Sequence, residues 1–425
     1  MILHRLLVSV VDIVLVLSII VMAWVAFGLL VLAVRFVIDE RRVRQSGGPP
    51  ACPPITGDVP HVLVQLPVFN EPAVVENVLR TAAALDWPRD KLTIQLLDDS
   101  TDDTSVIAER VAAELRAGGT DVQHVRREDR SGFKAGALAA GLELSDAPYI
   151  AMLDVDFRPP ANWLKCVMPL LLADPRAGFA QSRCEFVNYD TNWLTRVQGL
   201  LLDAHFLIEQ QTRARAGWLF QFNGTGGIWR RAAIEAAGGW SAYSITEDLD
   251  LAIRAKLAGW HGIFVAEPAI PGQVPDTVRN WRRQQRRWSN GFVQVARRTL
   301  GPLLRAPWPF AEKFSAISMM TMQAVFPAIA IGFVAAVLAF LLRGLDLRPY
   351  IPEIAIITIL TVAVALGMTL PPYIALKRGP ISRYVQTIVL VPFLVIYLGG
   401  ANAPKMIQTW RGRTEMFKRT PKLEA

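Results

Sequence analysis

The sequence predicts an α/β domain with a mostly parallel central sheet, joined to an α-helical transmembrane region. Two observations predict this class. From residue 61 onward, apolar segments typical of strands alternate with helical segments, an order that favours a parallel sheet with ligands at the carboxyl ends of its strands. The 425 residues are 52% hydrophobic, with a mean hydropathy of +0.30, which indicates a membrane protein carrying a full-sized soluble domain.

The N-terminal segment is expected to cross a bilayer. Residues 6–34 are apolar apart from one aspartate and a few small polar groups, and they exceed the length of a signal-peptide core. The following residues 39–45 are richer in positive charge than the short N-terminus, so the positive-inside rule places them in the cytoplasm. We expect a transmembrane helix over residues 1–40 and a Gly- and Pro-rich linker over residues 41–60.

The three cysteines are widely spaced. Cys52, Cys166 and Cys184 form no CxxC pair. The spacing predicts neither a disulfide framework nor a zinc site, and this agrees with a reducing compartment.

The soluble domain, expected over residues 61–275, begins with two strand and helix pairs. An apolar strand from residue 61 precedes a helix at 73–84, and a second strand ends in four acids before the next helix. A carboxylate at a strand end can accept hydrogen bonds from a base edge or a ribose hydroxyl. A helix-capping cluster is the alternative, but four acids exceed what capping requires. Asp98 and Asp99 are therefore candidate nucleotide-binding residues.

A lysine and a pair of aspartates come next. Lys134 lies in the small-residue helix 130–142 and could reach a phosphate or a nucleobase, although glycines near a helix start also occur for close packing. The strand within 148–160 carries Asp154 and Asp156, which can face the same way because they are two residues apart. Two carboxylates at a strand end suit a hard divalent cation that also takes diphosphate oxygens. We expect Asp154 and Asp156 to bind Mg²⁺ or Mn²⁺.

Residues 161–240 are expected to be a helical passage that includes a glycine-rich turn. The turn contains Thr225 within the run QFNGTGGIWRR, and its backbone could approach an acceptor sugar. A plain turn before a helix at 230–237 is the alternative.

A second carboxylate pair lies at the expected start of a helix. Glu247 and Asp248 follow Thr246 in TEDLDLAIRA. A structural interpretation is a helix start, with Thr246 as N-cap and acids at the positive end of the helix dipole. A functional interpretation makes Asp248 a general base with Glu247 close to the acceptor. The two interpretations are compatible.

A basic run begins 36 residues after Asp248. Arg287, helped by Gln284, could hold a diphosphate in a fork of donors, and Trp288 could stack on the apolar face of a sugar. A base, fixed positive charge and an indole ring are the groups that sugar transfer from a nucleotide diphosphate requires.

The whole segment 276–312 is strongly basic. It carries eight arginines and no acid between residues 277 and 311. Nucleic-acid binding is an alternative for such a run. However, the arginines alternate with aromatic residues and leucines, and an apolar segment follows directly, which favours an amphipathic helix at an anionic bilayer surface. We therefore expect the lipid bilayer, and no nucleic acid, as a partner.

The C-terminal cluster, residues 313–410, contains three apolar stretches, at about 314–342, 354–376 and 385–403. One span before the soluble domain and three after it would leave the C-terminus outside, whereas the basic tail 411–425 should be inside. A break at Gly399-Gly400, or a missed or re-entrant segment, would reconcile the two arguments.

Six motifs carry a resemblance to a known family. They occur in the order DDSTDDT, KAGAL, LDVDFRP, NGTGGIWR, TEDLDLAIRA and QQRRW. In this order, between one N-terminal span and a C-terminal membrane cluster, they resemble family 2 inverting glycosyltransferases of the cellulose synthase superfamily. The segment PDTVRNWRRQQRRW and the closing FKRTPK are most similar to the cellulose-synthase-like A and C branches, which make mannan, glucomannan and β-glucan backbones.

The resemblance implies a GT-A-type nucleotide-sugar-binding domain and a role for each motif residue. The implied roles are nucleotide contact for Asp98 and Asp99, a place near the donor for Lys134, nucleotide and metal binding for Asp154 and Asp156, general base for Asp248, and diphosphate and acceptor binding for Gln284, Arg287 and Trp288. The chain lacks the cyclic-dinucleotide-binding extension of bacterial cellulose synthases and the zinc-binding region of plant ones. We therefore expect no regulation or assembly of those kinds.

The expected function is processive synthesis of a β-linked polysaccharide from a nucleotide sugar, either GDP-mannose or UDP-glucose, coupled to export. The expected location is the inner or plasma membrane, or the Golgi membrane, with the catalytic domain in the cytoplasm. The alternatives are transfer of one sugar to a lipid, as in ceramide glucosyltransferases, and a non-enzymatic scaffold or sugar-nucleotide sensor. The sequence makes no prediction of oligomeric state.

Overall fold

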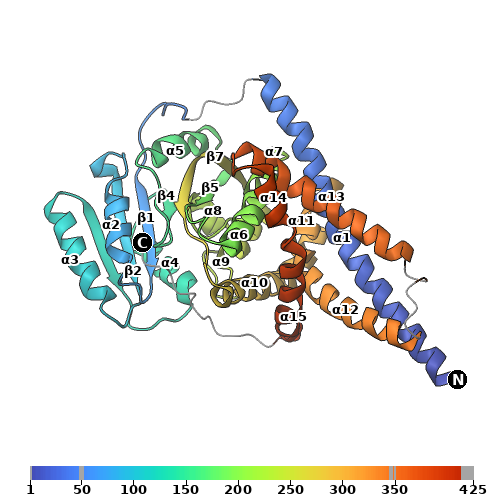
Figure 1. The fold of residues 1–425 in the computed structure, drawn as a ribbon. Coiled ribbons are helices and arrows are strands. Elements are labelled where there is room, and N and C mark those ends of the chain that lie inside the picture. Colours follow the sequence, from blue (N-terminus) through green and yellow to red (C-terminus); the bar gives the residue numbers. More distant parts are fainter. Residues whose placement is uncertain (1, 47–51, 344–347, 349–350, 413–425) are drawn as a thin grey trace. The chain divides into compact units, whose positions relative to one another are not determined.

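The computed structural model describes residues 2–46, 52–343, 348 and 351–412, and its chain divides into two compact units (Figure 1). The first unit contains the described residues of Met1–Glu40, Asp190–Glu209 and Asp276–Met416. The second contains those of Arg41–Tyr189 and Gln210–Pro275. The chain therefore passes between the two units several times.

The second unit is built on a seven-stranded sheet with the order β3-β2-β1-β4-β6-β5-β7. Only β6 runs antiparallel to its neighbours, so the prediction of a mostly parallel sheet is confirmed. The strands β1 and β2 are buried along almost their whole length, which explains their nearly continuous apolar sequences. The strands are β1 (Val62–Val68), β2 (Leu92–Asp98), β3 (Asp121–Arg126), β4 (Tyr149–Met152), β5 (Ala177–Phe186), β6 (Gly227–Arg230) and β7 (His261–Gly272).

The order of the strands reverses between β1 and β4. Helices α2 (Val75–Ala83) and α3 (Thr104–Ala117) connect β1, β2 and β3 in one direction, and α4 (Phe133–Glu143) leads the chain back to β4. Since such crossovers are right-handed, α4 covers the opposite face of the sheet from α2 and α3. Gly141 on α4 packs closely, because a Cβ there would lie 2.3 Å from Gln95 Oε1. Ligands bind at such a reversal point, at the carboxyl ends of the strands.

The expected helical passage at 161–240 is wrong in part. It contains the strands β5 and β6 among several short helices. Buried on both faces, β5 mixes apolar residues with Gln181, Ser182 and Arg183, so it lacks the alternation that reveals a half-exposed strand. The helices are α5 (Trp163–Ala173), α6 (Trp193–Ala204), the π-helix η2 (His205–Gln210), α7 (Gln211–Arg215) and α8 (Arg231–Ala236).

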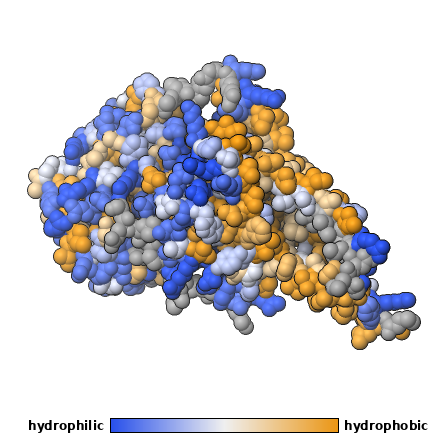
Figure 2. Space-filling model, in the orientation of Figure 1, coloured by the Kyte–Doolittle hydropathy of each residue, from blue (hydrophilic) through white to orange (hydrophobic). Residues whose placement is uncertain are grey.

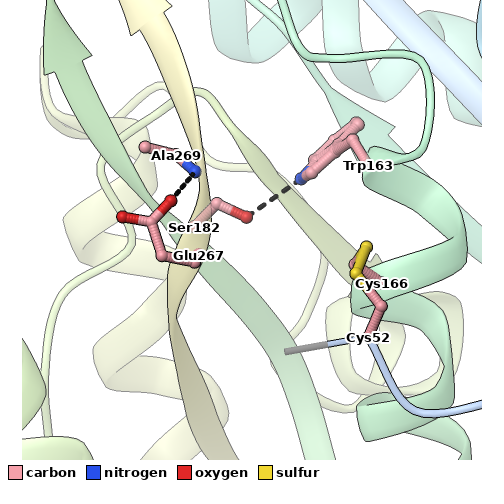
Figure 3. Close-up of a disulfide and its surroundings, with 6 residues drawn as sticks. All are labelled: Cys52, Trp163, Cys166, Ser182, Glu267 and Ala269. Carbon is pink, nitrogen blue, oxygen red and sulfur yellow. Dashed lines mark hydrogen bonds between the residues drawn. A yellow bond between two sulfur atoms is a disulfide. The ribbon is translucent and has the colours of Figure 1, made fainter. Parts of the chain in front are cut away.

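A disulfide joins Cys52 to Cys166, so the prediction that the cysteines do not pair is wrong (Figure 3). The two cysteines are 114 residues apart, and the fold brings the linker beside α5. Spacing along the chain carries no information about such a contact. On α5, Trp163 also donates from Nε1 to Ser182 Oγ on β5 at 2.9 Å, which fixes the helix against the sheet (Figure 3). Cys184 is buried and is not part of the disulfide.

Four helical stretches of the first unit are long and apolar enough to cross a membrane, as the sequence predicts. Large apolar side chains are exposed along α1 and α12, and the surface over these helices is hydrophobic (Figure 2). The length and apolar composition of these stretches indicate a membrane protein. The stretches are Ile2–Val43, Phe310–Leu342, Thr358–Ala375 and Ile381–Trp410. Besides α6 and most of η2, the described helices of the unit are α1 (Ile2–Ser46), α10 (Val278–Arg305), α11 (Phe310–Thr321), the short η3 (Met322–Ala324), α12 (Val325–Leu342), α13 (Ile351–Ala375), α14 (Ile381–Ile388) and α15 (Val391–Trp410).

Small residues bring α1 close to its neighbours. A Cβ on Gly332 of α12 would lie 2.9 Å from Ser18 Cβ, and one on Gly367 of α13 would lie 3.3 Å from Ala33 Cβ. Small residues at such contacts let apolar helices approach closely in a bilayer. Near the N-terminal end of α1, Arg343 Nη2 lies 2.6 Å from Asp12 Oδ2, so the charge that interrupts the apolar segment is paired.

The suggested break at Gly399-Gly400 is wrong, because both glycines lie inside the continuous helix α15. Residues 389–390 separate α14 from α15 instead, and Pro392 occupies the first turn of α15, where its missing N–H is tolerated. Helix α15 packs along α10 and α12, and Arg297 Nη1 of α10 donates to Thr409 O at 3.0 Å. The C-terminal end of α15 therefore lies beside the basic helix α10. Residues 413–425, most of the predicted basic tail, lie outside the described residues.

Helix α6 packs against the apolar helices of the first unit, although its sequence falls between strands of the sheet. Asp203 on α6 is 1% exposed and accepts two hydrogen bonds of 2.8 Å from Nε and Nη2 of Arg378. Leu200 packs with Tyr373 and Tyr384 in one buried cluster. An ion pair and an apolar contact thus fix α6 to the loop after α13 and to α14.

Candidate active site

Lys134 is at the centre of the candidate site, in the first turn of α4. Its Nζ donates to Asp154 Oδ1 at 2.6 Å and to Gly224 O at 2.8 Å, and lies 3.8 Å from Glu247 Oε1. Burial alone would lower the pKa of Lys134, but the charges of Asp154, Glu247 and Asp248 raise it above its ordinary value. The structure therefore holds a fixed positive charge among three acids.

Asp248 lies beside this lysine at the start of α9 (Glu247–Leu257). Its Oδ1 accepts from Leu249 N at 2.9 Å, and a Cβ on Gly224 would lie only 2.8 Å from its Oδ2. The predicted helix start is confirmed, with acids in the first turn. Thr246 stands at the N-cap position, but its hydroxyl bonds to Ser244 Oγ at 3.0 Å and makes no cap hydrogen bond to α9.

The glycine-rich turn before β6 places its backbone next to Lys134 and Asp248. Gly224 and Gly226 have φ values of +75° and +68°, which other residues rarely adopt. Thr225 is 4% exposed, and its Oγ1 accepts from Asp154 N at 2.9 Å. Gln181 Nε2 donates to Thr225 O at 2.9 Å from β5. Thr225 thus fixes the position of Asp154 as well as of the turn.

Strand β4 ends at Met152, and Asp154 and Asp156 lie in the turn that follows it. Burial raises the pKa of the Cys184 thiol, and the charges of Asp156 and Asp154 raise it further. Within the described ranges, no group of three or more His, Cys, Asp or Glu residues is placed to hold a metal ion. Two carboxylates still fit a divalent cation that takes its other ligands from diphosphate oxygens and water.

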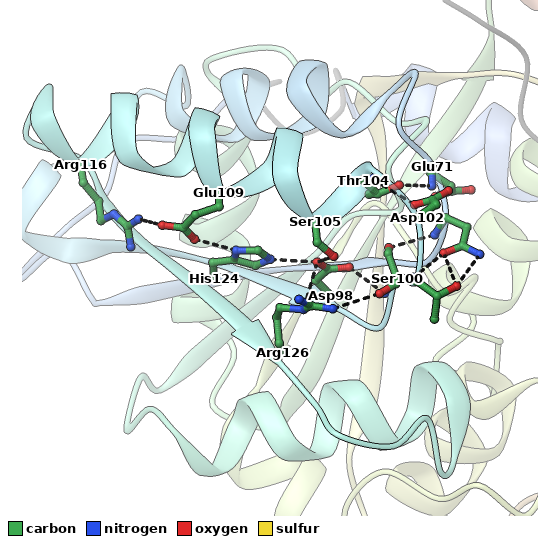
Figure 4. Close-up of polar contacts among 12 residues, drawn as sticks. Glu71, Asp98, Ser100, Asp102, Thr104, Ser105, Glu109, Arg116, His124 and Arg126 are labelled. Carbon is green, nitrogen blue, oxygen red and sulfur yellow. Dashed lines mark hydrogen bonds and ion pairs between the residues drawn. The ribbon is translucent and has the colours of Figure 1, made fainter.

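Asp98 and Asp99 differ in their surroundings. Asp98 is 1% exposed, and its oxygens accept from Ser100 N at 2.8 Å and Ser105 Oγ at 2.6 Å (Figure 4). Asp99 accepts from Nε and Nη2 of Arg127 at 2.8 and 2.5 Å. Both carboxylates are therefore buried, since the Asp99 side chain is 6% exposed, and they differ in their partners: Arg127 holds Asp99, whereas Asp98 is embedded in the loop that follows β2.

Sequence reasoning missed Arg127. Its Nη1 and Nη2 donate to Ser131 O and Phe133 O, at 2.9 and 3.2 Å, so it connects Asp99 to the start of α4. Nearby, the guanidinium of Arg130 lies 3.4 Å from the centroid of the Phe69 ring. The signal that could have found both arginines is the basic cluster after the third strand, opposite a strand that ends in acids.

Gln284, Arg287 and Trp288 lie on α10, in the other unit. Their spacing of three and four residues puts them on one face of that helix. All three are half-buried. Their contribution to a site with Asp248 stays a prediction.

Comparisons with known proteins agree with the predicted resemblance. Residues 149–371 match the family model described as glycosyl transferase family group 2. Glucomannan 4-beta-mannosyltransferase 2 of Arabidopsis thaliana is 40% identical over 256 residues, which cover 59% of this chain and 48% of the relative. Glucomannan 4-beta-mannosyltransferase 1 of Cyamopsis tetragonoloba is 41% identical over 238 residues, 55% of this chain and 45% of the relative. The chain spans about half the length of the curated relatives it matches.

A solved structure shows the same fold. The mannosyltransferase PcManGT from Pyrobaculum calidifontis, in complex with GDP-Man and Mn²⁺, superimposes with a TM-score of 0.56 and 22% sequence identity, covering 81% of this chain and 98% of its own. The likeness confirms the predicted fold class. The matched family model covers more than half of the chain, and the six motifs lie in the predicted order. The chain therefore belongs to glycosyl transferase family group 2.

Proposed function

We propose that the protein is an inverting hexosyltransferase that extends a β-linked polysaccharide from a nucleotide sugar at a membrane. The observation that carries the proposal is the cluster in which Asp248 Oδ2 and the Lys134 ammonium approach the same glycine, Gly224. A carboxylate that can take a proton thus lies beside a cation that can oppose a developing negative charge.

The mechanism is a single displacement. Asp248 accepts the proton of an acceptor hydroxyl, and the hydroxyl oxygen attacks the anomeric carbon from the face opposite the diphosphate. The bond between that carbon and the diphosphate oxygen breaks, the nucleoside diphosphate leaves, and the configuration inverts from α to β. Lys134 opposes the charge on the leaving group, because its raised pKa keeps it protonated.

The other predicted residues bind the two substrates. Gln284 and Arg287 donate hydrogen bonds to the diphosphate, and Trp288 stacks on the terminal sugar of the acceptor. Asp99 contacts the nucleotide, with Asp98 behind it. Glu247 and Thr225 are proposed to contact the acceptor next to Asp248.

Asp154 and Asp156 would hold Mg²⁺ or Mn²⁺ together with the diphosphate oxygens. The cation, when bound, supplies positive charge that stabilises the leaving diphosphate. Support comes from the two carboxylates in one turn beside Lys134, and from the fold neighbour of P. calidifontis, which was solved with Mn²⁺ and GDP-Man.

GDP-mannose is the proposed donor, and UDP-glucose is the alternative. The support is that the relatives with about 40% identity are glucomannan 4-beta-mannosyltransferases. The same relatives favour a polysaccharide acceptor over the lipid acceptor. The polymer is proposed to be exported through the membrane next to which it is made.

We infer that the protein lies in the inner or plasma membrane, or in the Golgi membrane, with its catalytic unit in the cytoplasm. The positive-inside rule applied to residues 39–45 supports this side, whereas the cysteines give no support for it, because Cys52 and Cys166 are paired. The bond between Arg297 and Thr409 supports a C-terminus on the same side as α10. The basic α10 is proposed to contact anionic lipid, and no nucleic-acid partner is proposed.

The test is incorporation of label from GDP-mannose and UDP-glucose, supplied separately to purified protein in lipid with Mg²⁺ or Mn²⁺. The product is sized and digested with linkage-specific hydrolases, with Asp248→Asn as the inactive control. Long β-linked chains from one donor would support the proposal and identify the sugar. A product one sugar long that extracts into organic solvent, or no transfer from either donor, would contradict it.

A further inference from the structure

A buried histidine connects the end of β2 to helix α3, behind the candidate nucleotide-binding acids. The side chain of His124, on β3, is 6% exposed. Its Nε2 lies 2.9 Å from Asp98 Oδ2, and its Nδ1 lies 2.7 Å from Glu109 Oε2 on α3 (Figure 4). The imidazole thus bridges a carboxylate at the core of the sheet and one at the surface.

The two contacts together require a proton on each ring nitrogen of His124. A neutral imidazole has one donor and one acceptor, whereas an ionised carboxylate only accepts. Burial alone raises the pKa of Asp98, but hydrogen bonds from His124, Ser105 and Ser100 outweigh it and lower that pKa to about 2, so Asp98 is ionised. Two hydrogen bonds to two carboxylates therefore require the imidazolium form of His124.

The surrounding charges favour this form. Burial would lower the pKa of His124, but the hydrogen bonds to Asp98 and Glu109 outweigh it and raise the pKa above its ordinary value. The other charged groups here are Arg116, which donates to Glu109, and Arg126, whose Nε lies 3.9 Å from Asp98 Oδ2 (Figure 4).

Asp98 connects His124 to the loop after β2 through hydrogen bonds. Its Oδ1 accepts from Ser100 N, and Ser100 Oγ in turn accepts from Asn70 N at 2.9 Å, in the turn after β1. Asp99 lies between Asp98 and Ser100. The position of Asp99 therefore depends on its neighbour Asp98, which His124 holds in place.

We propose that His124 is a positioning residue for donor binding, which as an imidazolium fixes Asp98 and so orders residues 99–104 to receive the nucleotide. The inference rests on the proposed function, because the nucleotide-binding role of Asp99 belongs to it. The contribution of a group with a raised pKa is complete below the ordinary value and is lost as the pH rises through the raised one. Order in the loop and affinity for the nucleotide should therefore fall together at a pH above about 6.5, the ordinary value for histidine.

The experiment uses the full chain in lipid nanodiscs between pH 5.5 and 9. Two quantities are measured: the hydrogen-exchange protection of the amides of residues 99–104 without ligand, corrected for the intrinsic pH dependence of exchange, and the affinity for GDP and for UDP. The variants are His124→Gln and, as a matched control, His261→Gln. His261 Nε2 pairs with Asp174 Oδ2 at 2.7 Å, at the start of β7 and away from this loop.

The wild type and His261→Gln should lose protection and affinity in one step above pH 6.5. His124→Gln should lack the step, with GDP affinity reduced about tenfold at pH 6.5, the effect of one hydrogen bond to a charged group. Unchanged protection and an unchanged pH profile in His124→Gln would overturn the inference.

A second variant guards against misfolding of His124→Gln. The Glu109 side chain is 53% exposed, so Glu109→Gln should fold normally, and loss of its charge should move the step to lower pH. If the pH of the step is the same in Glu109→Gln as in the wild type, His124 is not the group that titrates in the step. A step in exchange without affinity for GDP or for UDP would support the anchoring of the loop and contradict the proposed function. Normal GDP affinity without a step would contradict only the inference.

Discussion

Substitution of Gly224 by alanine tests whether the contact between Gly224 and Asp248 determines the rate. The added Cβ would lie 2.8 Å from Asp248 Oδ2 and 3.5 Å from Lys134 Nζ. The first distance is about 0.6 Å short of the 3.4 Å at which ordinary van der Waals contact begins. Either the carboxylate or the turn must therefore move by that amount.

The magnitude has two parts. Alanine at φ +75° raises the energy of the folded state by about 1–2 kcal/mol, because a Cβ disfavours the left-handed region. A displacement of about 0.6 Å in the base should lower the turnover rate roughly 10- to 100-fold, since a misplacement of about 1 Å can reduce the rate about 100-fold. Affinity for GDP should change little, because Asp248 acts on the acceptor.

The assay measures label transfer, GDP affinity and the thermal unfolding midpoint of Gly224→Ala in parallel with Gly119→Ala. Gly119 also has a positive φ, +80°, but a Cβ there meets no atom within 4 Å. Both variants should lose similar stability, and only Gly224→Ala should lose turnover. Equal turnover in the two variants would refute the reasoning that this contact positions the base.

Three further predictions concern single residues. Asp248→Asn should keep donor binding but lose at least about 100-fold in rate, and near-normal turnover would remove Asp248 from the role of base. Trp288→Ala should reduce transfer to a sugar acceptor more than GDP binding, and a selective loss of nucleotide affinity would contradict stacking on the acceptor. Arg378→Ala should destabilise the protein by about 3–5 kcal/mol, because it leaves Asp203 charged and buried. Arg383→Ala, which breaks an exposed pair, should lower stability by less than about 1 kcal/mol, and equal unfolding midpoints for the two arginine variants would argue against this account.

The sequence predicts three strands of the sheet, β1, β2 and β4. The strands β1 and β2 are continuous apolar runs that end in polar residues, and the helices between them follow at short intervals. The strands β5 and β7 escape detection for two reasons. Buried polar residues such as Gln181 and Arg183 interrupt β5, and Pro268 and Pro271 lie within β7.

The sequence also predicts which side chains lie together at the site, because the ends of parallel strands and the starts of helices meet at one edge of a sheet. Lys134, Asp154, Thr225 and Asp248 are brought together as expected. Their partners from neighbouring strands are not predictable in this way. His124 reaches Asp98 only through the register of β2 and β3, in which Asp98 lies opposite Arg126. The pairing of Cys52 with Cys166 depends on the tertiary structure for the same reason.

The position of α6 bears on how the protein can be divided for experiments. A soluble fragment cut at residues 61 and 275 would carry Asp203 without Arg378, and would expose Leu200 to water in place of two tyrosines. Asp203 would lose its counterion, and the apolar face of α6 would become exposed to water. Such a fragment should therefore aggregate. Catalytic and apolar parts are therefore interleaved along the chain, and biochemical work on the transferase chemistry should begin with the intact protein in lipid.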